Sequence, residues 1–548
     1  MIAARASPER APRLPLAAKG RLEPLARWSL AAALLTALAI RVWLNARSNW
    51  LIDGDEALFG IAAVNILHGA HPTFLYGVPY MGMLQSYAAV PVVALLGPTP
   101  PALRLVTILG GLAYVVVTWL LAHELYDPSI AALAAWFAAI PSVYFDATGL
   151  KVWGVYVGVM ALGGMVLVGV WRCRRQAGRL HAGWWLLLGL AAGLVLWANF
   201  LVVYYLATAL LLLPWRRLRA WLPGAALGGI PGLVVGGSPL WWYNLRHHWA
   251  TFHFVFGGTQ TSDRSSTIAV AEELWRTLLP RVLGLTSPWS TLPRWVTWSL
   301  GAVVALALLN ALIETIGGAI PRRGIKVAPA GRPWPLLLFL VITLAIYLLS
   351  GFGRPSLSPF DASGRYLLPL WTAAPILVAA LCARVGRIAL PLGAALVLLV
   401  LAANLAGHLA SSPRLVFQSP YWNHLPLDSR PLYRWLLQRQ VTAVWMNHWA
   451  GNQLMYATGG QVLAADYYDI VVGHGINRLP DVFERVRATQ RVAYVVVTAP
   501  GEITPLEQRL RQLGVAYEHV DLPPYQVFLP TSRHVDPSEV VNGLAYPY

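Results

Sequence analysis

The sequence predicts a polytopic α-helical membrane protein with a small extracytoplasmic α/β domain at its C-terminal end. The 548-residue chain is 57% hydrophobic and 12% charged, and its mean hydropathy is +0.55, values that argue against a water-soluble globule. Its cationic residues gather in short loops between apolar segments. After about residue 411 the composition changes to alternating strand-like and helix-like runs.

The positive charge of the chain sets its orientation in the membrane and does not indicate a nucleic-acid partner. The net charge is +17, and the cations lie mainly in short loops. Short loops rich in Arg and Lys remain cytoplasmic. Four such loops lie near residues 172–179, 216–219, 322–332 and 384–387, and a basic tail at residues 1–27 agrees with them.

Eleven apolar segments are expected to cross the membrane within a transmembrane domain at residues 28–410. They lie near residues 28–45, 102–123, 129–146, 152–171, 184–198, 200–214, 222–240, 295–316, 334–350, 366–383 and 388–408. The first has no cleavage signal after it and is expected to remain as an anchor. An odd number of crossings puts the N-terminus in the cytoplasm and the C-terminus outside.

This topology predicts that four segments lie outside the cell membrane and meet on one face. They are residues 46–101, 146–151, 241–294 and 351–365. The apolar run 83–97 within the first of them is short for a membrane span, so we expect it to lie along the membrane surface.

The C-terminal part, residues 411–548, is predicted to be an extracytoplasmic α/β domain. Strand-like runs at 441–447, 461–466, 491–498 and 525–530 alternate with helix-like runs at 479–489 and 504–514. Neither GxGxxG nor GxxxxGK[ST] occurs there, so the sequence does not support a nucleotide site.

The densest acidic cluster lies directly after the first apolar segment, in "NWLIDGDEALFG" at residues 49–60. Asp53 and Glu56 have the spacing of a capping box for a helix that runs to about His68 and stops at Gly69. A capping box explains Asp53 and Glu56 but does not explain Asp55. Ionisable residues at a membrane edge are functional candidates, and a carboxylate can deprotonate an attacking hydroxyl or amine. We therefore expect Asp55 to be a general base, with Glu56 or Asp53 tuning it.

The region from Asp53 to Ser142 resembles the opening of the GT-C glycosyltransferases. The shared pattern is an Asp-Glu pair after the first helix, a Gly-x-Pro-Tyr turn at residues 77–80, an apolar segment ending in Gly97, and "ALRL" opening the next helix. Further similarity lies in "PLWWYNLRHHWATF" at 239–252 and "SGRYLLPL" at 363–370. The likeness is greatest to bacterial relatives of protein O-mannosyltransferases and aminoarabinose transferases, which are glycosyltransferase family 39-like.

The resemblance implies a fold, a reaction and a location. It implies an inverting transferase in the bacterial inner membrane that takes a sugar from a polyprenyl-phosphate donor embedded among membrane lipids. The acceptor would be an extracytoplasmic glycan, lipid or protein. Asp55 would correspond to the catalytic Asp of the family and Glu56 to its neighbour. A second acidic residue found in some relatives is not recognisable, although Asp146 lies close to its place.

A phosphate leaving group needs cations at the outer ends of the helices. Arg365, followed by Tyr366, lies where an outer loop enters the membrane, and its guanidinium offers a fork to a phosphate. Lys151 begins another helix on the same side and is the weaker candidate, because snorkelling to the interface explains it equally well. Arg246 is a further possible phosphate contact.

No metal or other cofactor is expected. His247, His248 and His253 have ligand chemistry, but an aromatic and polar interfacial belt explains that loop better. Asp53-x-Asp55 resembles the DxD pattern that chelates a divalent cation, so a metal ion at these two carboxylates is the alternative. Because no further acidic ligand is recognisable, we do not favour it.

Two alternatives compete with a transferase. In a membrane transporter or flippase for a lipid-linked or small polar substrate, the acidic cluster would bind a coupling ion, but the sequence shows neither internal repeats nor charges near the middle of its helices. A catalytically silent scaffold for the outer domain would leave Asp55 unexplained.

Overall fold

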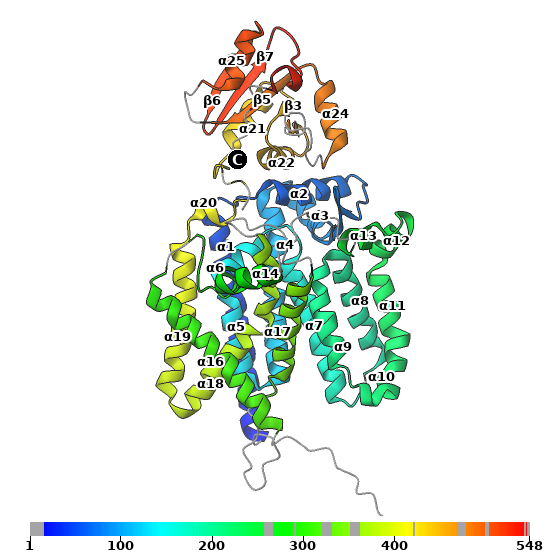
Figure 1. Ribbon diagram of the computed structural model, residues 1–548, viewed down its shortest axis with the longest axis vertical. Helices are drawn as coiled ribbons and strands as arrows, with labels where there is room; N and C mark the ends of the chain where they lie inside the picture. The colour runs from blue at the N-terminus through cyan, green and yellow to red at the C-terminus, as the bar shows by residue number, and fades with distance from the viewer. Residues whose placement is uncertain are drawn as a thin grey trace, which may run out of the picture.

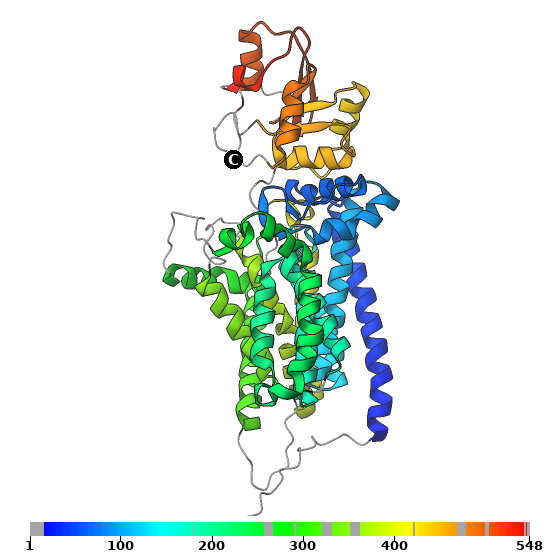
Figure 2. The ribbon, with the colours of Figure 1, turned by 90° about the vertical axis from the view of Figure 1, so that its right-hand side faces the viewer.

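The computed structural model shows a bundle of membrane-length helices with a separate α/β domain on one of its ends (Figures 1 and 2). The structure describes residues 16–178, 180–256, 267–289, 292–319, 331–350, 362–419, 422, 424–467, 478–498, 503–541 and 544.

Helices account for all eleven segments predicted to cross the membrane. Within the described residues, six stretches are long and apolar enough to span it: α1 (Leu16–Arg47), α4 (Pro100–Leu125), α7 (Tyr156–Arg175), the stretch Trp215–Gly236 that includes α10 (Leu218–Gly224) and α11 (Ile230–Gly236), α16 (Arg294–Ala319) and α19 (Leu390–Ala410). The protein is therefore a multi-pass membrane protein.

The other five segments are bent or short. Two are helix pairs with a sharp bend: α5 (Pro128–Ala139) with α6 (Val143–Leu150) at 70°, and η6 (Ala362–Thr372) with α18 (Ala374–Ile388) at 42°. Three are shorter apolar helices: α8 (Ala182–Ala198), the stretch Phe200–Leu212 that contains α9 (Val203–Leu212), and α17 (Trp334–Leu349). Counted by length, the spans number six, or eight with the bent pairs, so eleven crossings remain a prediction.

The break between α5 and α6 has a clear local cause. Pro141 has no backbone N–H and disrupts the helix, and the Ser142 hydroxyl then accepts from the Phe145 N–H at 3.3 Å to cap α6. The Ile140 carbonyl, released by the break, accepts a hydrogen bond from Asn404 Nδ2 at 2.8 Å. A side chain of α19 thus satisfies the backbone at the bend, as helix breaks inside a membrane require.

The first helix is longer than predicted. It begins at Leu16, so the second half of the tail expected at residues 1–27 is helical, and residues 1–15 lie outside the described residues. The reason is that this part is rich in Leu, Ala and Arg, which favour helix.

The two ends of the bundle differ in charge as the sequence predicts. Arg172 and Arg175 both pair with Glu124 at 2.7 Å, and Arg387 pairs with Asp127 at 3.0 Å, which brings the ends of α4, α7 and α18 together. The opposite end of α4 meets the C-terminal domain. Arg172, Arg175 and Arg387 therefore lie at the end of the bundle opposite to that domain.

The segment predicted to lie outside at residues 46–101 forms a small cap on the bundle. It contains α2 (Gly54–Leu67), the strands β1 (Phe74–Leu75) and β2 (Val78–Gly82), and α3 (Leu84–Leu96). The predicted turn is the β1–β2 hairpin, where Gly77 adopts a φ of +72°. The apolar run 83–97 forms α3, which packs against α2 and α4 at the top of the bundle (Figure 1).

A further segment predicted to lie outside is at the same end. Residues 241–294 include α12 (Ser238–Arg246), α13 (Ala250–Phe256), α14 (Thr267–Glu273) and α15 (Leu279–Val282), which gather around the upper end of the bundle (Figure 1). Most of the loop 351–365 lies outside the described residues.

The C-terminal domain contains a five-stranded sheet in the order β4-β3-β5-β7-β6. Its strands are β3 (Ala443–Trp445), β4 (Leu463–Ala465), β5 (Val492–Val497), β6 (Tyr517–Leu522) and β7 (Tyr525–Pro530). β3 is parallel to β4 and β5, and β7 is antiparallel to β5 and β6.

The predicted strands and helices of this domain are confirmed, but the prediction missed other elements, including two longer helices and a strand. The two predicted helices are α24 (Pro480–Ala488) and α25 (Pro505–Gln512), whereas α21 (Arg430–Gln438), α22 (His448–Ala457) and β6 were not expected. β6 was missed because it is an edge strand that alternates polar residues, "YEHVDL", instead of forming an apolar run.

Candidate functional site

Asp53 and Glu56 form the predicted capping box at the start of α2. The Glu56 N–H donates to Asp53 Oδ1 at 3.0 Å, and the Asp53 N–H donates to Glu56 Oε2 at 3.1 Å. The helix ends at Leu67, His68 is its C-cap, and Gly69 follows with a φ of +96°, as expected from the sequence.

Both capping carboxylates are also held in buried ion pairs. Lys151 Nζ lies 2.9 Å from Asp53 Oδ2, and Arg104 NH1 lies 2.6 Å from Glu56 Oε1. Arg104 NH2 also donates to Glu56 Oε2 at 3.0 Å, and the Val152 N–H donates to Glu56 Oε1 at 2.8 Å. The first turn of α2 is thereby locked to α4 and to the residues that follow α6.

Asp55 differs from its two acidic neighbours. Its side chain makes no hydrogen bond or ion pair with any described residue, and it is mostly buried but retains some exposure. Burial raises the pKa of Asp55, whereas the nearby charges of Arg478, His448 and Arg365 lower it and that of Asp53 raises it. Asp55 is thus a carboxylate with free acceptor atoms in a cationic surrounding, the state that a general base requires.

Arg365 and Tyr366 lie near this carboxylate. The guanidinium of Arg365 stands over the Trp153 ring at 4.8 Å from its centre and donates from NH2 to the Tyr366 hydroxyl at 3.1 Å. Lys151 Nζ lies 4.5 Å from the centre of the same Trp153 ring. Both cations therefore contact Trp153, and Arg365 contributes to the field at Asp55.

Lys151 is more tightly bound than the sequence indicated. Besides Asp53, its ammonium donates to the Gln418 carbonyl at 2.5 Å, and the side chain is 3% exposed. In this structure Lys151 is committed to anchoring α2, so its predicted contact with a phosphate would require it to leave Asp53.

Arg246 lies apart from the acidic cluster. It is exposed at the end of α12, where its guanidinium stacks 4.0 Å from the centre of the Trp242 ring. His247 stacks on Tyr243 with 4.1 Å between the ring centres. These contacts fit the interfacial aromatic belt that the sequence favoured. Among the described residues, no group of three His, Cys, Asp or Glu is placed to hold a metal ion, and the independence of metal stays a prediction.

Asp146 belongs to a different cluster of charges. On α6, its carboxylate lies 3.0 Å from Arg41 NH2 and 3.1 Å from His408 Nε2, and all three side chains are buried. Arg41 is on α1 and His408 is on α19. The cluster therefore ties α1, α6 and α19 together through buried charges.

Two hollows among the described membrane helices bear on the site. The larger, about 620 Å³, is almost wholly apolar and runs between α15, α16, α17 and α18; its residues include Leu279, Ala305, Leu340, Leu370 and Val378. Leu370 is on η6, the same element that carries Arg365. An apolar groove therefore begins beside the element that supplies the cation.

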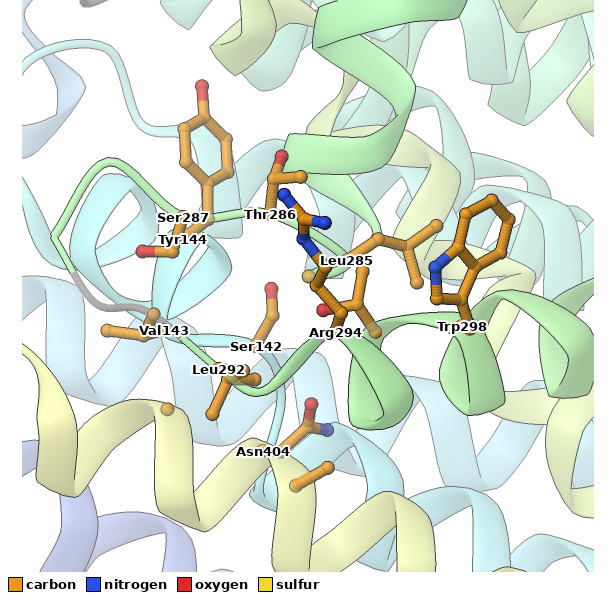
Figure 3. A pocket seen from close by; sticks show the side chains of 14 residues that line it. Ser142, Val143, Tyr144, Leu285, Thr286, Ser287, Leu292, Arg294, Trp298 and Asn404 are labelled. Atoms are coloured by element: carbon orange, nitrogen blue, oxygen red, sulfur yellow. The ribbon is translucent and has the colours of Figure 1, made fainter.

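The second hollow, about 460 Å³, is more polar and lies at the start of α6 (Figure 3). Its wall includes Ser142, Tyr144, Thr286, Arg294 and Asn404, whose side chains surround the space in that view. Lys151, which binds Asp53, follows the other end of α6. The hollow is thus separated from the acidic cluster by the length of that helix.

Comparisons with solved structures identify the fold. ArnT from Cupriavidus metallidurans, bound to undecaprenyl phosphate, superposes with a TM-score of 0.58 at 15% identity and covers 93% of this chain and 98% of its own. The apo form of that protein gives a TM-score of 0.57, with 97% and 100% covered. The chain has the GT-C fold.

The archaeal oligosaccharyltransferase AglB from Archaeoglobus fulgidus gives a TM-score of 0.48 at 11% identity and covers 93% of this chain and 74% of its own. No protein-family model and no curated protein sequence matches the chain.

Within this GT-C fold, several site residues were not identified from the sequence. The sequence assigns Arg104 no role beyond the motif "ALRL". A cation in an apolar helix nevertheless indicates a buried acidic partner. His448, Asp466 and Arg478 come from the C-terminal domain and belong to no recognisable motif. His448 and Arg478 act on Asp55, and Asp466 binds His448, because that domain packs against α2.

Proposed function

We propose that this protein is a membrane glycosyltransferase that transfers a sugar from a polyprenyl-phosphate donor to an extracytoplasmic acceptor. The observation that carries the proposal is the state of Asp55. It alone of the three clustered carboxylates has unoccupied acceptor atoms among the described residues, and it lies near Arg365 at the end of a bundle with the GT-C fold. The likeness to ArnT, whose structure contains undecaprenyl phosphate, supports this class of donor.

The proposed reaction is an inverting displacement at the anomeric carbon. The acceptor hydroxyl or amine attacks C1 of the sugar and its proton passes to Asp55, while the bond from C1 to the phosphate oxygen breaks and its electron pair leaves with the lipid phosphate. Arg365 is placed to stabilise the charge that develops on that phosphate, and Tyr366 orients the guanidinium. Asp53 and Glu56 act through the backbone of α2, which they anchor.

The apolar groove between α15, α16, α17 and α18 is the proposed place of the isoprenoid chain. It opens among membrane helices, and η6 connects its Leu370 with Arg365. A donor lying there would have its chain among apolar side chains and its phosphate near the cation. We further propose that the protein lies in the bacterial inner membrane, with its N-terminus in the cytoplasm and its C-terminal domain outside.

The proposal is tested with the purified protein and a panel of polyprenyl-phosphate-linked sugars. Consumption of one of these donors, by transfer or by slow hydrolysis, is the expected result. Consumption of a nucleotide sugar with all lipid-linked sugars untouched would overturn the donor assignment. Vectorial transport of an intact substrate into proteoliposomes without cleavage would support the transporter alternative instead.

Arg365→Gln is expected to weaken the binding of undecaprenyl phosphate by about 10- to 150-fold, the loss of one hydrogen bond to a charged group. Arg365→Lys should recover part of this affinity, because it restores the charge without the planar fork. Isothermal titration in detergent measures both. Arg294→Gln is the matched control, since that Arg lines the polar hollow at the other end of α6. Equal weakening by the control would remove Arg365 from its role.

Ala305→Trp is expected to obstruct the groove and to raise the KM for a long-chain donor about tenfold or more. Displacing even two methylene groups from an apolar site costs roughly 1.6 kcal/mol. A donor with a chain of two isoprene units should be affected less. Ala302→Trp is the control, because Ala302 is equally exposed on α16 but does not line the groove. An identical KM for both variants and both chain lengths would place the chain elsewhere.

A further inference from the structure

The C-terminal domain touches the membrane part of the chain at the residue that precedes Asp55. In α22, which lies directly above α2 in Figure 1, Asn452 Nδ2 donates to the Gly54 carbonyl at 3.1 Å. A Cβ atom on Gly54 would lie 2.6 Å from Trp449 Cα and 2.8 Å from the His448 carbonyl oxygen. Only glycine allows this approach, so the contact brings the start of α22 against the start of α2.

Further hydrogen bonds hold the two helices in this arrangement. Gln453 Nε2 donates to the Ile52 carbonyl, and the Tyr456 hydroxyl donates to the Thr99 carbonyl at 3.0 Å. Arg478 NH1 reaches the Tyr76 carbonyl at 3.4 Å from a separate part of the domain. The position of the domain over α2 therefore depends on several independent contacts.

The side chain of His448 is fixed at this junction. Its Nδ1 lies 2.6 Å from Asp466 Oδ2, and its backbone N–H donates to the same oxygen at 3.0 Å. Asp466 directly follows β4, so the sheet of the domain orients the ring. Nε2 makes no hydrogen bond with a described residue, and the side chain is 36% exposed.

The charges around Asp55 come from both parts of the chain. Arg365 belongs to the membrane bundle, whereas Arg478 and His448 belong to the C-terminal domain. Asp53, the like charge that acts on Asp55, is itself paired with Lys151. Asp466 is the acidic group that contacts His448. Without the domain, Asp55 would keep one of its three cationic neighbours.

We propose that the C-terminal domain completes the reaction site, and that His448, oriented by Asp466, is the cationic partner that this domain supplies to the Asp55 carboxylate. The inference rests on the proposed function for its catalytic meaning. His448 is a positioning residue: it forms no bond with the substrate, and its imidazolium stabilises the ionised carboxylate before the acceptor proton arrives. Proton transfer to Asp55 then removes that charge pair.

The test measures the protonation of Asp55 without requiring catalysis. A hydrophobic carbodiimide modifies protonated carboxyl groups, so its rate of reaction with Asp55, followed by mass spectrometry between pH 4 and 9, reports the midpoint of titration. His448→Gln is expected to move the midpoint up by roughly one pH unit, since an opposite charge is removed. Asp466→Asn should cause a smaller shift in the same direction, and His448→Arg should restore the wild-type midpoint. His519→Gln, on β6, is the control and should leave the midpoint unchanged.

The same variants are then assayed with the lipid-linked donor. The acidic limb of kcat/KM should shift with the labelling midpoint in His448→Gln and return in His448→Arg. An unchanged midpoint in His448→Gln, or a rate lowered equally at every pH without rescue by Arg, would overturn the inference. If His448→Gln shifts the midpoint but the wild-type protein consumes no lipid-linked sugar, the pairing of His448 with Asp55 stands and the proposed function is refuted.

Discussion

Asp55→Asn is expected to lower the rate of sugar transfer by about 100- to 10,000-fold, the contribution of a positioned general base. The amide keeps the size of the side chain but cannot accept the acceptor proton. Since the role concerns only the transfer step, binding of undecaprenyl phosphate should stay within about twofold of wild type. Donor consumption by the purified variant and titration with the free lipid phosphate separate the two effects.

The stability of this variant supplies the control. Asp55 makes no hydrogen bond with a described residue, so its replacement breaks no contact. Because burial raises its pKa, the folded state favours the protonated form, and the ionised form at neutral pH lowers stability relative to a neutral side chain. The unfolding temperature of Asp55→Asn should therefore equal or exceed that of the wild type. A variant that is inactive because it is unfolded, or one with full activity, would contradict the assignment.

The same pKa shift predicts a pH dependence. In the proposed mechanism the active form is the carboxylate, whose population falls as the pH falls through the pKa of Asp55. Burial raises that pKa, so the acidic limb of the activity should lie above the usual range of an aspartate. The profile of kcat/KM for the free enzyme measures it. A limb below pH 4 would show that the ionisation of Asp55 does not control the rate.

The capping box could be predicted because its signal is local. Asp53 and Glu56 are three positions apart, and the hydrogen bonds they form depend on little beyond that spacing. The partners of the same two carboxylates could not be predicted. Lys151 lies 98 positions from Asp53 and Arg104 lies 48 positions from Glu56, so both ion pairs depend on how whole helices pack.

The membrane helices, too, could be predicted only in part. Hydropathy located every apolar segment, but it assigned one continuous helix to residues 129–146, where Pro141 divides α5 from α6. Membrane helices tolerate proline when a neighbour satisfies the freed backbone, and here that neighbour is Asn404, more than 260 positions away. The bend could not be predicted from the sequence, because it depends on the packing of α19 against this segment.

Glu56→Ala is expected to destabilise the protein by about 3–5 kcal/mol, the usual result of removing one partner of a buried ion pair. Arg104 would be left as a buried cation with the Leu51 and Leu150 carbonyls as acceptors, at 2.7 and 2.6 Å, and with no counter-charge. The loss should appear as an unfolding temperature lowered by several degrees in detergent. Activity should fall as well, because the first turn of α2 positions Asp55.

A double-mutant cycle separates the ion pair from the packing around it. Glu56→Leu with Arg104→Met replaces both charges by apolar side chains, and it should be more stable than the sum of the single changes, because no uncompensated charge remains. Since Leu restores neither the cap on the Asp53 N–H nor the bond from the Val152 N–H, the double variant should regain stability but not full activity. If Glu56→Ala unfolds at the wild-type temperature, the pair does not hold α2 in place. The position of the Asp55 carboxylate would then depend on the Asp53–Lys151 pair and on the C-terminal domain.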